Sequence, residues 1–334
     1  MGRRLVAFAF LLVLACGARA QQPSSYAFDI PRWFADSFLD FRDEVADATR
    51  EHKRLLVYFG QDGCPYCRQL MVVNFSQAPI VEKTRRDFVA IALNVWGDRE
   101  TTWTDGRTMS EKALARALDV QFTPTLLFLD ERGAIVARLD GYYPPQRFES
   151  VLDYVAQHLE RTQSLGDYLR THVKDRASDR LADEPFYLPA PYDLHARGDG
   201  KPLAVLFETP DCSPCDELHR DTLRRPAVEA QLGRFDVVRF GLGMPTPLVA
   251  PDGRATTAGA WARELDVAYT PSLILFDAHG KEVLRISAYL RAFHLASALE
   301  YVASGAYRGE PSFQRYIRER RERVRDAGGN AELW

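Results

Sequence analysis

Residues 55–67 read LLVYFGQDGCPYC, and this stretch decides the fold. Its first five residues form a continuous apolar run of aliphatic and aromatic side chains, which predicts a strand buried on both faces of a sheet. Cys64 and Cys67 follow after a short loop, and residues 65–75 are predicted to form a helix. Two cysteines three positions apart at the start of a helix lie on one helix face, as an internal disulfide requires.

The same pattern recurs 148 residues later (64 to 212). Residues 203–207 read LAVLF and lead to Cys212 and Cys215. Further identical residues lie 147 positions apart and include Asp105 with Asp252, Arg116 with Arg263, Thr123 with Thr270, Pro124 with Pro271, and Tyr154 with Tyr301. A shift of only one residue over this length indicates a duplicated domain.

Both copies show the same order of predicted elements, which indicates an α/β fold. The predicted strands are 55–59, 89–93, 125–129 and 135–139 in the first copy, and 203–207, 237–240, 272–276 and 283–286 in the second. The predicted helices are 65–75, 110–118 and 145–160, then 213–223, 257–265 and 292–303.

Composition limits the classes of function. The net charge of −3 over 334 residues shows no excess of basic residues, so no nucleic-acid partner is expected. Arg3 and Arg4 precede an apolar run over 5–15 that is too short to cross a bilayer, and Ala-Arg-Ala over 18–20 is typical of a cleavage site. We expect a signal peptide over 1–20 and export; a lipoprotein anchor at Cys16 is the alternative.

Export affects how the other four cysteines are interpreted. Each pair closes almost no loop, so stabilising the fold is not its obvious purpose. A zinc site would bring two such pairs together within one small domain. Covalent haem would need a histidine where Arg68 and Asp216 stand. An inert structural disulfide stays as an alternative to a redox centre.

The strand, the Cys-x-x-Cys, the helix and a later Thr-Pro before another strand together resemble the thioredoxin superfamily in both copies. The resemblance implies two tandem thioredoxin-like domains, each a central mixed sheet flanked by helices. It implies a cis proline at Pro124 and Pro271, which with Thr123 and Thr270 would form the substrate-binding loops beside the cysteines. It implies no metal and no cofactor.

The first copy also resembles the SoxW-like periplasmic thioredoxins, through residues 59–67, the Asn-Val-Trp-Gly-Asp segment at 94–98, the Phe-Thr-Pro-Thr segment at 122–125 and Gly-Tyr at 141–142. What this implies is a reductase kept reduced by a membrane electron donor, with protein thiols and disulfides as partners. The domains are then expected at 21–163 and 186–310, with a linker at 164–185. A charged tail at 311–334 is predicted to be a solvated helical extension, with docking to an anionic partner as the alternative.

Two features depart from typical thioredoxins. The buried carboxylate that they keep six residues before the first cysteine is replaced by Tyr58 and by Leu206. Acidic residues, namely Glu208, Asp211, Asp216 and Glu217, surround the second pair. Like charge disfavours a thiolate, so Cys212 is expected to have a higher thiol pKa than Cys64. His219 is predicted to be a packed or exposed helix residue, with a catalytic base as the alternative. Trp33, Phe34 and Phe38 are predicted to hold an N-terminal helix on the first domain.

The sequence therefore predicts a periplasmic thiol–disulfide oxidoreductase. Cys64 and Cys212 would attack a partner's disulfide, and Cys67 and Cys215 would resolve the mixed disulfide. Two alternatives stay open: a disulfide oxidase or isomerase, and a partner-binding or chaperone protein in which only the first domain reacts.

Overall fold

The computed structural model describes residues 28–173, 177–198 and 200–327. The predicted signal peptide and Cys16 lie outside this range. Of the helices in these ranges, none has both the length and the apolar character needed to cross a bilayer.

The first domain contains the predicted strands and helices together with several short elements that the sequence did not reveal. Its elements are α1 (Phe41–Arg50), β1 (Arg54–Gly60), α2 (Pro65–Gln69), the π-helical turn η1 (Leu70–Asn74), α3 (Ala78–Asp87), β2 (Phe88–Asn94), β3 (Glu100–Thr102), β4 (Thr108–Ser110), α4 (Glu111–Ala117), β5 (Thr125–Leu129), β6 (Ile135–Asp140) and α5 (Pro145–Ala156). The 3₁₀ turn η2 (Leu159–Arg161) and α6 (Leu165–His172) follow.

The second domain repeats this order. Its elements are β7 (Tyr192–Asp193), β8 (Leu203–Glu208), α7 (Ser213–Arg220), η3 (Thr222–Arg224), α8 (Pro226–Leu232), β9 (Asp236–Gly241), β10 (Pro247–Val249), β11 (Ala255–Thr257), α9 (Ala258–Glu264), β12 (Ser272–Phe276), β13 (Glu282–Ile286), α10 (Ala292–Ala303), η4 (Ala306–Arg308) and α11 (Phe313–Asp326).

The two main sheets have one topology. The strand order is β2-β1-β5-β6 in the first domain and β9-β8-β12-β13 in the second. In each sheet the first pair of strands is parallel and the other two pairs are antiparallel. These are mixed sheets, and the predicted fold class is confirmed.

The two faces of β1 explain the continuous apolar run at 55–59. Leu56 and Tyr58 point into a core shared with α2 and α5, whereas Leu55, Val57 and Phe59 point into a second core shared with α1 and α4. Every residue of β1 is buried, because helices cover both faces of the sheet.

The aromatic residues before the first domain contact it only in part. The rings of Trp33 and Phe34 lie 5.1 and 5.8 Å from that of Phe75. Phe38 is fully exposed, at 102%, so the prediction that it holds a helix on the domain is wrong. Residues 31–34 form a turn, and the helix begins only at Phe41.

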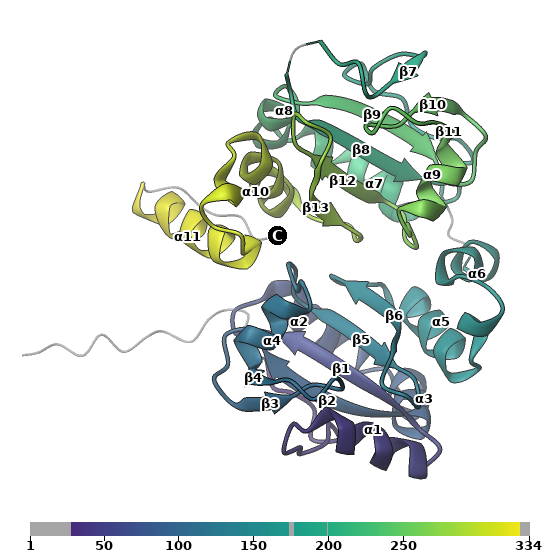
Figure 1. Ribbon diagram of the computed structural model, residues 1–334, viewed down its shortest axis with the longest axis vertical. Helices are drawn as coiled ribbons and strands as arrows, with labels where there is room; N and C mark the ends of the chain where they lie inside the picture. Colours follow the sequence, from purple (N-terminus) through teal and green to yellow (C-terminus); the bar gives the residue numbers. More distant parts are fainter. Residues whose placement is uncertain (1–27, 174–176, 199, 328–334) are drawn as a thin grey trace, which may run out of the picture.

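The charged tail is not a solvated extension. Phe313, Tyr316 and Ile317 are buried on one side of α11, at the spacing of an amphipathic helix. The Phe313 ring lies 5.3 Å from that of Phe122, and the Phe313 amide donates to Gln121 Oε1 at 3.0 Å. The prediction is corrected: α11 extends from the second domain and packs on the first (Figure 1).

The segment predicted as a linker holds a helix that makes the reciprocal contact. Helix α6 follows the first domain and lies against the second, where a Cβ at Gly166 would come within 3.0 Å of Ala268 Cα. Leu165, Tyr168 and Leu169 of α6 are buried. The helix after each domain thus packs on the loop that precedes the other domain's Thr-Pro, with α6 and α11 on opposite sides of the molecule (Figure 1).

Candidate active site

The first cysteine pair lies where α2 begins. Cys64 is the N-cap residue, its Sγ accepts a hydrogen bond from the Cys67 amide at 3.0 Å, and Pro65 occupies the first turn, where a missing N–H has no cost. The two residues form a disulfide with Cα atoms 5.2 Å apart. Cys64 is 5% exposed and Cys67 is fully buried. A partner therefore reaches Cys64 before Cys67.

The second pair has the same geometry in a more enclosed place. Cys212 is the N-cap of α7, its Sγ accepts from the Cys215 amide at 3.2 Å, and the pair is disulfide-bonded with Cα atoms again 5.2 Å apart. Cys212 is only 1% exposed and Cys215 is 5% exposed, which is the reverse of the order of burial in the first pair. Ser178 packs beside this helix start, since its amide donates to Asp216 and its carbonyl accepts from Asp211.

Both Thr-Pro bonds are cis. In the first domain, Cys64 Sγ lies 3.4 Å from both the carbonyl oxygen and Oγ1 of Thr123. In the second, Thr270 Oγ1 lies 3.1 Å from Thr209 Oγ1, in the loop before the cysteines. The fold thus brings the sequence-predicted loops to the cysteine pairs, although the two threonines make different contacts.

Comparison with known families agrees with this geometry. The family model of the thioredoxin-like domain matches residues 41–156 and again 194–303, which together make up more than half of the chain. The chain belongs to the thioredoxin-like family. The two matched segments are the two copies of the duplication. No curated protein resembles the chain closely enough to count as a match.

Solved structures with similarity to this tandem thioredoxin-like protein share its fold. A thioredoxin-fold protein from Helicobacter pylori is 22% identical, with 42% of this chain and 86% of that chain covered and a TM-score of 0.34. A thioredoxin from Thermus thermophilus is 28% identical, with 35% and 84% covered and a TM-score of 0.28. Poplar thioredoxin h is 18% identical, with 34% and 87% covered and a TM-score of 0.26. At such scores, family membership rests on the family model.

The second thioredoxin-like domain contains a buried ionic cluster that the sequence only partly indicated. His219, on α7, lies between two carboxylates. Its Nε2 is 3.0 Å from Glu208, at the end of β8, and its Nδ1 is 3.0 Å from Glu184. All three side chains are buried, and Arg224 reaches Glu184 at 3.3 Å. Burial alone would lower the pKa of His219, but the two carboxylates outweigh it and raise that pKa.

This cluster changes how the acidic surroundings of Cys212 are understood. The Glu208 carboxylate faces a histidine rather than the cysteines, and Asp216 accepts a backbone hydrogen bond from Ser178. The higher thiol pKa of Cys212 stays a prediction. Two of the four acidic residues near Cys212, Glu208 and Asp216, have partners other than the cysteines. His219 is packed, as predicted, but its partner Glu184 lies in the segment assigned to a linker, where no periodicity pointed to a buried carboxylate.

The first domain fills the corresponding position differently. Gly60 stands where the second domain has Glu208, and a Cβ on Gly60 would lie only 1.9 Å from Tyr58 Oη. The phenol of Tyr58 therefore occupies the space over Gly60. Its hydroxyl is buried and makes no hydrogen bond within the described part of the chain, and burial raises its pKa. The group that replaces the usual buried carboxylate is thus a neutral phenol.

We expect Gly60→Ala to lower the free energy of unfolding by about 1–3 kcal/mol, because the methyl group overlaps the phenol in a closed core. In a Tyr58→Leu background, which copies Leu206, the same change is expected to cost much less. Urea unfolding of the four proteins gives the coupling energy. Gly198→Ala is the matched control, since a Cβ there meets nothing within 4 Å. Equal costs in both backgrounds would contradict the assignment.

The first pair lies at the boundary between the domains. The amide of Arg291 donates to Tyr66 Oη at 2.9 Å, within the Cys-x-x-Cys itself. Gln61 Nε2 donates to Gln314 Oε1 on α11 at 2.6 Å and to Thr123 Oγ1 at 2.9 Å. The second domain and α11 therefore form part of the surroundings of Cys64.

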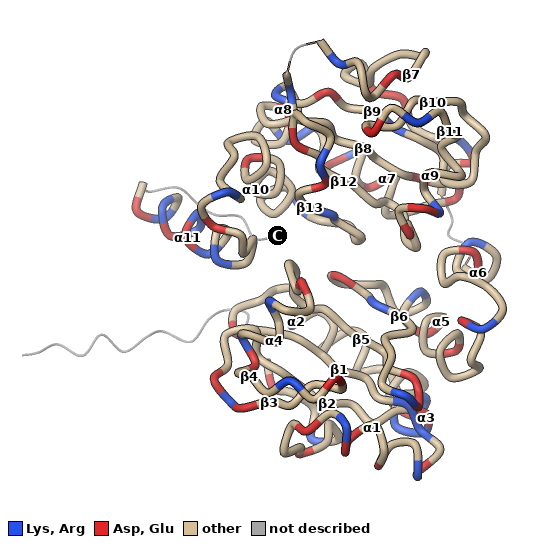
Figure 2. The backbone as a smooth tube through the Cα atoms, viewed as in Figure 1, with Lys and Arg blue, Asp and Glu red and all other residues tan. Residues whose placement is uncertain are grey.

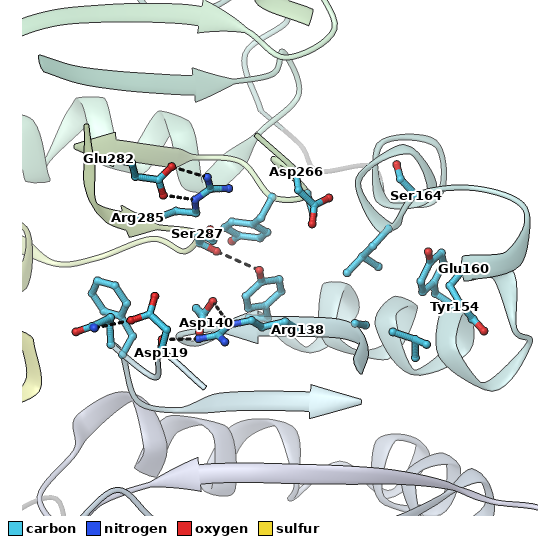
Figure 3. Close-up of a pocket in the computed structure, with 18 of the residues that line it drawn as sticks. Asp119, Arg138, Asp140, Tyr154, Glu160, Ser164, Asp266, Glu282, Arg285 and Ser287 are labelled. Carbon is cyan, nitrogen blue, oxygen red and sulfur yellow. Dashed lines mark hydrogen bonds and ion pairs between the residues drawn. The ribbon is translucent and has the colours of Figure 1, made fainter. Parts of the chain in front are cut away.

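A cavity of about 850 Å³ lies between the domains, away from the candidate site (Figure 3). Neither cysteine pair lines it. Its two arginines are already paired, Arg138 with Asp140 at 2.8 Å and Arg285 with Glu282 at 2.8 Å. The Tyr143 hydroxyl crosses it to donate to the Ser287 carbonyl at 3.0 Å.

Proposed function

We propose that the protein is an exported thiol–disulfide oxidoreductase that reduces or exchanges protein disulfides. The observation that carries the proposal is the placement of Cys64 and Cys212. Each is the N-cap of a helix, accepts a backbone amide on its sulfur, and is disulfide-bonded to the residue three positions on. Backbone amides and the helix dipole favour a thiolate over a thiol at this position.

The reaction follows from the order of burial in the first pair. The thiolate of reduced Cys64 attacks one sulfur of a partner's disulfide, which forms a mixed disulfide and releases the partner's other sulfur as a thiolate. Cys67 then attacks Cys64 Sγ, which releases the second partner thiol and leaves the disulfide found in the structure. Two electrons pass to the partner, and an external dithiol must restore Cys64 and Cys67.

Thr123 would take part by binding rather than by chemistry. Its carbonyl and hydroxyl lie within 3.4 Å of Cys64 Sγ, so a partner chain that presents a sulfur to Cys64 passes along this loop. Pro124, like Pro271, has no N–H, which leaves the loop's other backbone groups to pair with that chain. We assign the corresponding roles to Cys212, Cys215 and Thr270 in the second domain.

The test of this proposal is the reduction potential of each pair, measured by equilibrating the mature protein with redox buffers and counting free thiols by mass spectrometry. A potential near those of reducing thioredoxins, about −270 mV, supports reduction of partners; one near −120 mV makes the protein an oxidase. If neither pair cycles between dithiol and disulfide, the proposed function is excluded. Fractionation of cells tests export.

A second candidate function has one observation in its favour. Cys212 is 1% exposed, and the chain around Ser178 packs against the start of its helix. In this second candidate function, the second domain binds partners or stabilises the first domain, and only Cys64 and Cys67 react. Alkylation of the reduced protein distinguishes the two: labelling of Cys212 at a rate comparable with that of Cys64 excludes the second candidate.

A further inference from the structure

A cavity of about 360 Å³ opens beside Cys64. The first domain supplies residues that include Cys64, Pro65 and Thr123. The opposite side is formed by Leu290, by α10 through Phe293 and His294, and by α11. Cavities of this size hold small ligands or a few residues of a chain. The reactive sulfur of the first domain thus faces an enclosed space that the second domain completes.

Two arginines of α11 line this cavity, Arg318 and Arg321. Arg318 stacks over the Trp96 ring at 4.4 Å. Arg321 Nε is buried and without a hydrogen-bond partner among the described residues. Neither guanidinium makes an ion pair with a residue of the described ranges. Figure 2 shows the concentration of basic residues along α11.

Two other arginines of α11 are neutralised, whereas Arg318 and Arg321 are the arginines of this helix that line the cavity. Arg315 pairs with Glu310 at 3.2 Å, and Arg320 pairs with Glu300 at 2.7 Å. Burial, and then the positive charge of Arg325 and Arg318, lower the pKa of Arg321, while the carboxylate of Glu322 opposes this shift in part. An anion in the cavity would relieve this repulsion.

The remaining titratable groups of the wall do not supply that anion. Burial, with the charge of Arg321, lowers the pKa of His294 to about 4, so this histidine is neutral at pH 7. Its Nδ1 is buried and also has no hydrogen-bond partner within the described part of the chain. Asp62, an acidic residue of the lining, is exposed to solvent. Arg318 is exposed as well, so the charge of the partly buried Arg321 is the one that solvent screens least.

We propose that this cavity selects disulfides flanked by carboxylates, with the sulfur placed at Cys64 and the carboxylates at Arg318 and Arg321. The proposal rests on the proposed function, for which it names the substrate class. Two sources share this chemistry: a small disulfide with acidic groups, and an acidic extended segment of a protein. Cys64 and Cys67 supply two electrons and become a disulfide, and the two thiolates released from the substrate take up protons from solvent.

The test isolates the first pair in a Cys212→Ser/Cys215→Ser protein, reduced with dithiothreitol and desalted. The probes are three disulfides of nearly equal size: 3,3′-dithiodipropionate, which is anionic, bis(2-hydroxyethyl) disulfide, which is neutral, and cystamine, which is cationic. Oxidation of Cys64 and Cys67 is followed by mass spectrometry after acid quench. A free thiolate prefers the cationic probe, so a preference for the anionic one must come from the surrounding protein.

We expect the anionic probe to react fastest. In Arg318→Gln/Arg321→Gln, the ratio of its rate constant to that of the neutral probe is expected to fall at least about tenfold, as for loss of charge-assisted hydrogen bonds. Raising the ionic strength is expected to lower the ratio as well. Arg323→Gln is the control: it removes one positive charge from α11 outside the cavity, where Arg323 stacks on Tyr316 at 5.8 Å, and its ratio should not change.

An acidic peptide disulfide, run beside the small probes, separates the two sources. A fall in the ratio for dithiodipropionate indicates a small-molecule substrate; a fall confined to the acidic peptide indicates a protein segment. Unchanged ratios for both in the double variant overturn the inference while the proposed function stands. Failure of every probe to oxidise the pair would instead overturn the proposed function.

Discussion

Cys64→Ser is expected to lower disulfide reduction by the first domain at least about a hundredfold, because a serine hydroxyl at neutral pH is a far weaker nucleophile than a thiolate held by backbone amides. The measurement is insulin reduction with dithiothreitol as electron source, in a Cys212→Ser/Cys215→Ser background so that the second pair contributes nothing. The change replaces one sulfur atom with oxygen and alters the side-chain volume little, so the circular dichroism spectrum should be unaffected.

Cys67→Ser serves as the control that separates attack from resolution. Cys67 is fully buried whereas Cys64 lines a cavity, so Cys64 still attacks and the reaction stops at the mixed disulfide. Mass spectrometry should show the trapped partner on Cys64 and none in Cys64→Ser. Trapping through Cys67 in the Cys64→Ser protein would reverse the assignment of nucleophile and resolving residue.

Glu208→Ala is expected to have the largest effect on stability, about 3–5 kcal/mol lost from the free energy of unfolding. The change removes a carboxylate partner of buried His219 and leaves the imidazole Nε2 without it. The measurement is urea unfolding near pH 6. The Glu208→Leu/His219→Leu protein is the informative comparison, since replacing both members with apolar groups is expected to cost much less than removing one.

The same cluster predicts a pH dependence of known sign. The pKa of His219 is raised in the folded protein, so its contribution to stability is complete below the ordinary value of 6.5 and is lost as the pH rises through the folded pKa. Stability should therefore decline on the alkaline side more steeply in the parent protein than in the double-leucine variant. Identical slopes between pH 6 and pH 9 would show that folding does not raise the pKa of His219.

Much of the architecture was predictable because it depends on local signals. The apolar run at 55–59 and its repeat at 203–207 identify strands that helices cover on both faces, and the structure places β1 and β8 there. The cysteine spacing identifies the starts of α2 and α7. A duplicated pattern also limits error, since each copy checks the other.

What could not be predicted depends on contacts between distant parts of the chain. Phe313, Tyr316 and Ile317 follow helical spacing, but the same helix carries six arginines. Their burial depends on Tyr301 of α10 and on Gln121 and Phe122 of the other domain. Glu184 is an ordinary acidic residue until the fold brings His219 to it across 35 positions. Neither partner can be named from composition or periodicity.

The crossed placement of α6 and α11 has a consequence for dissecting the molecule. The last helix of each half packs on the other half. Separating the halves would therefore remove α11 from Phe122 of the first domain and α6 from Ala268 of the second. A half made alone would keep the packing of its own last helix, as of α11 on Tyr301, but would lack the helix that the other half supplies. Two separately made halves are therefore expected to bind each other when mixed.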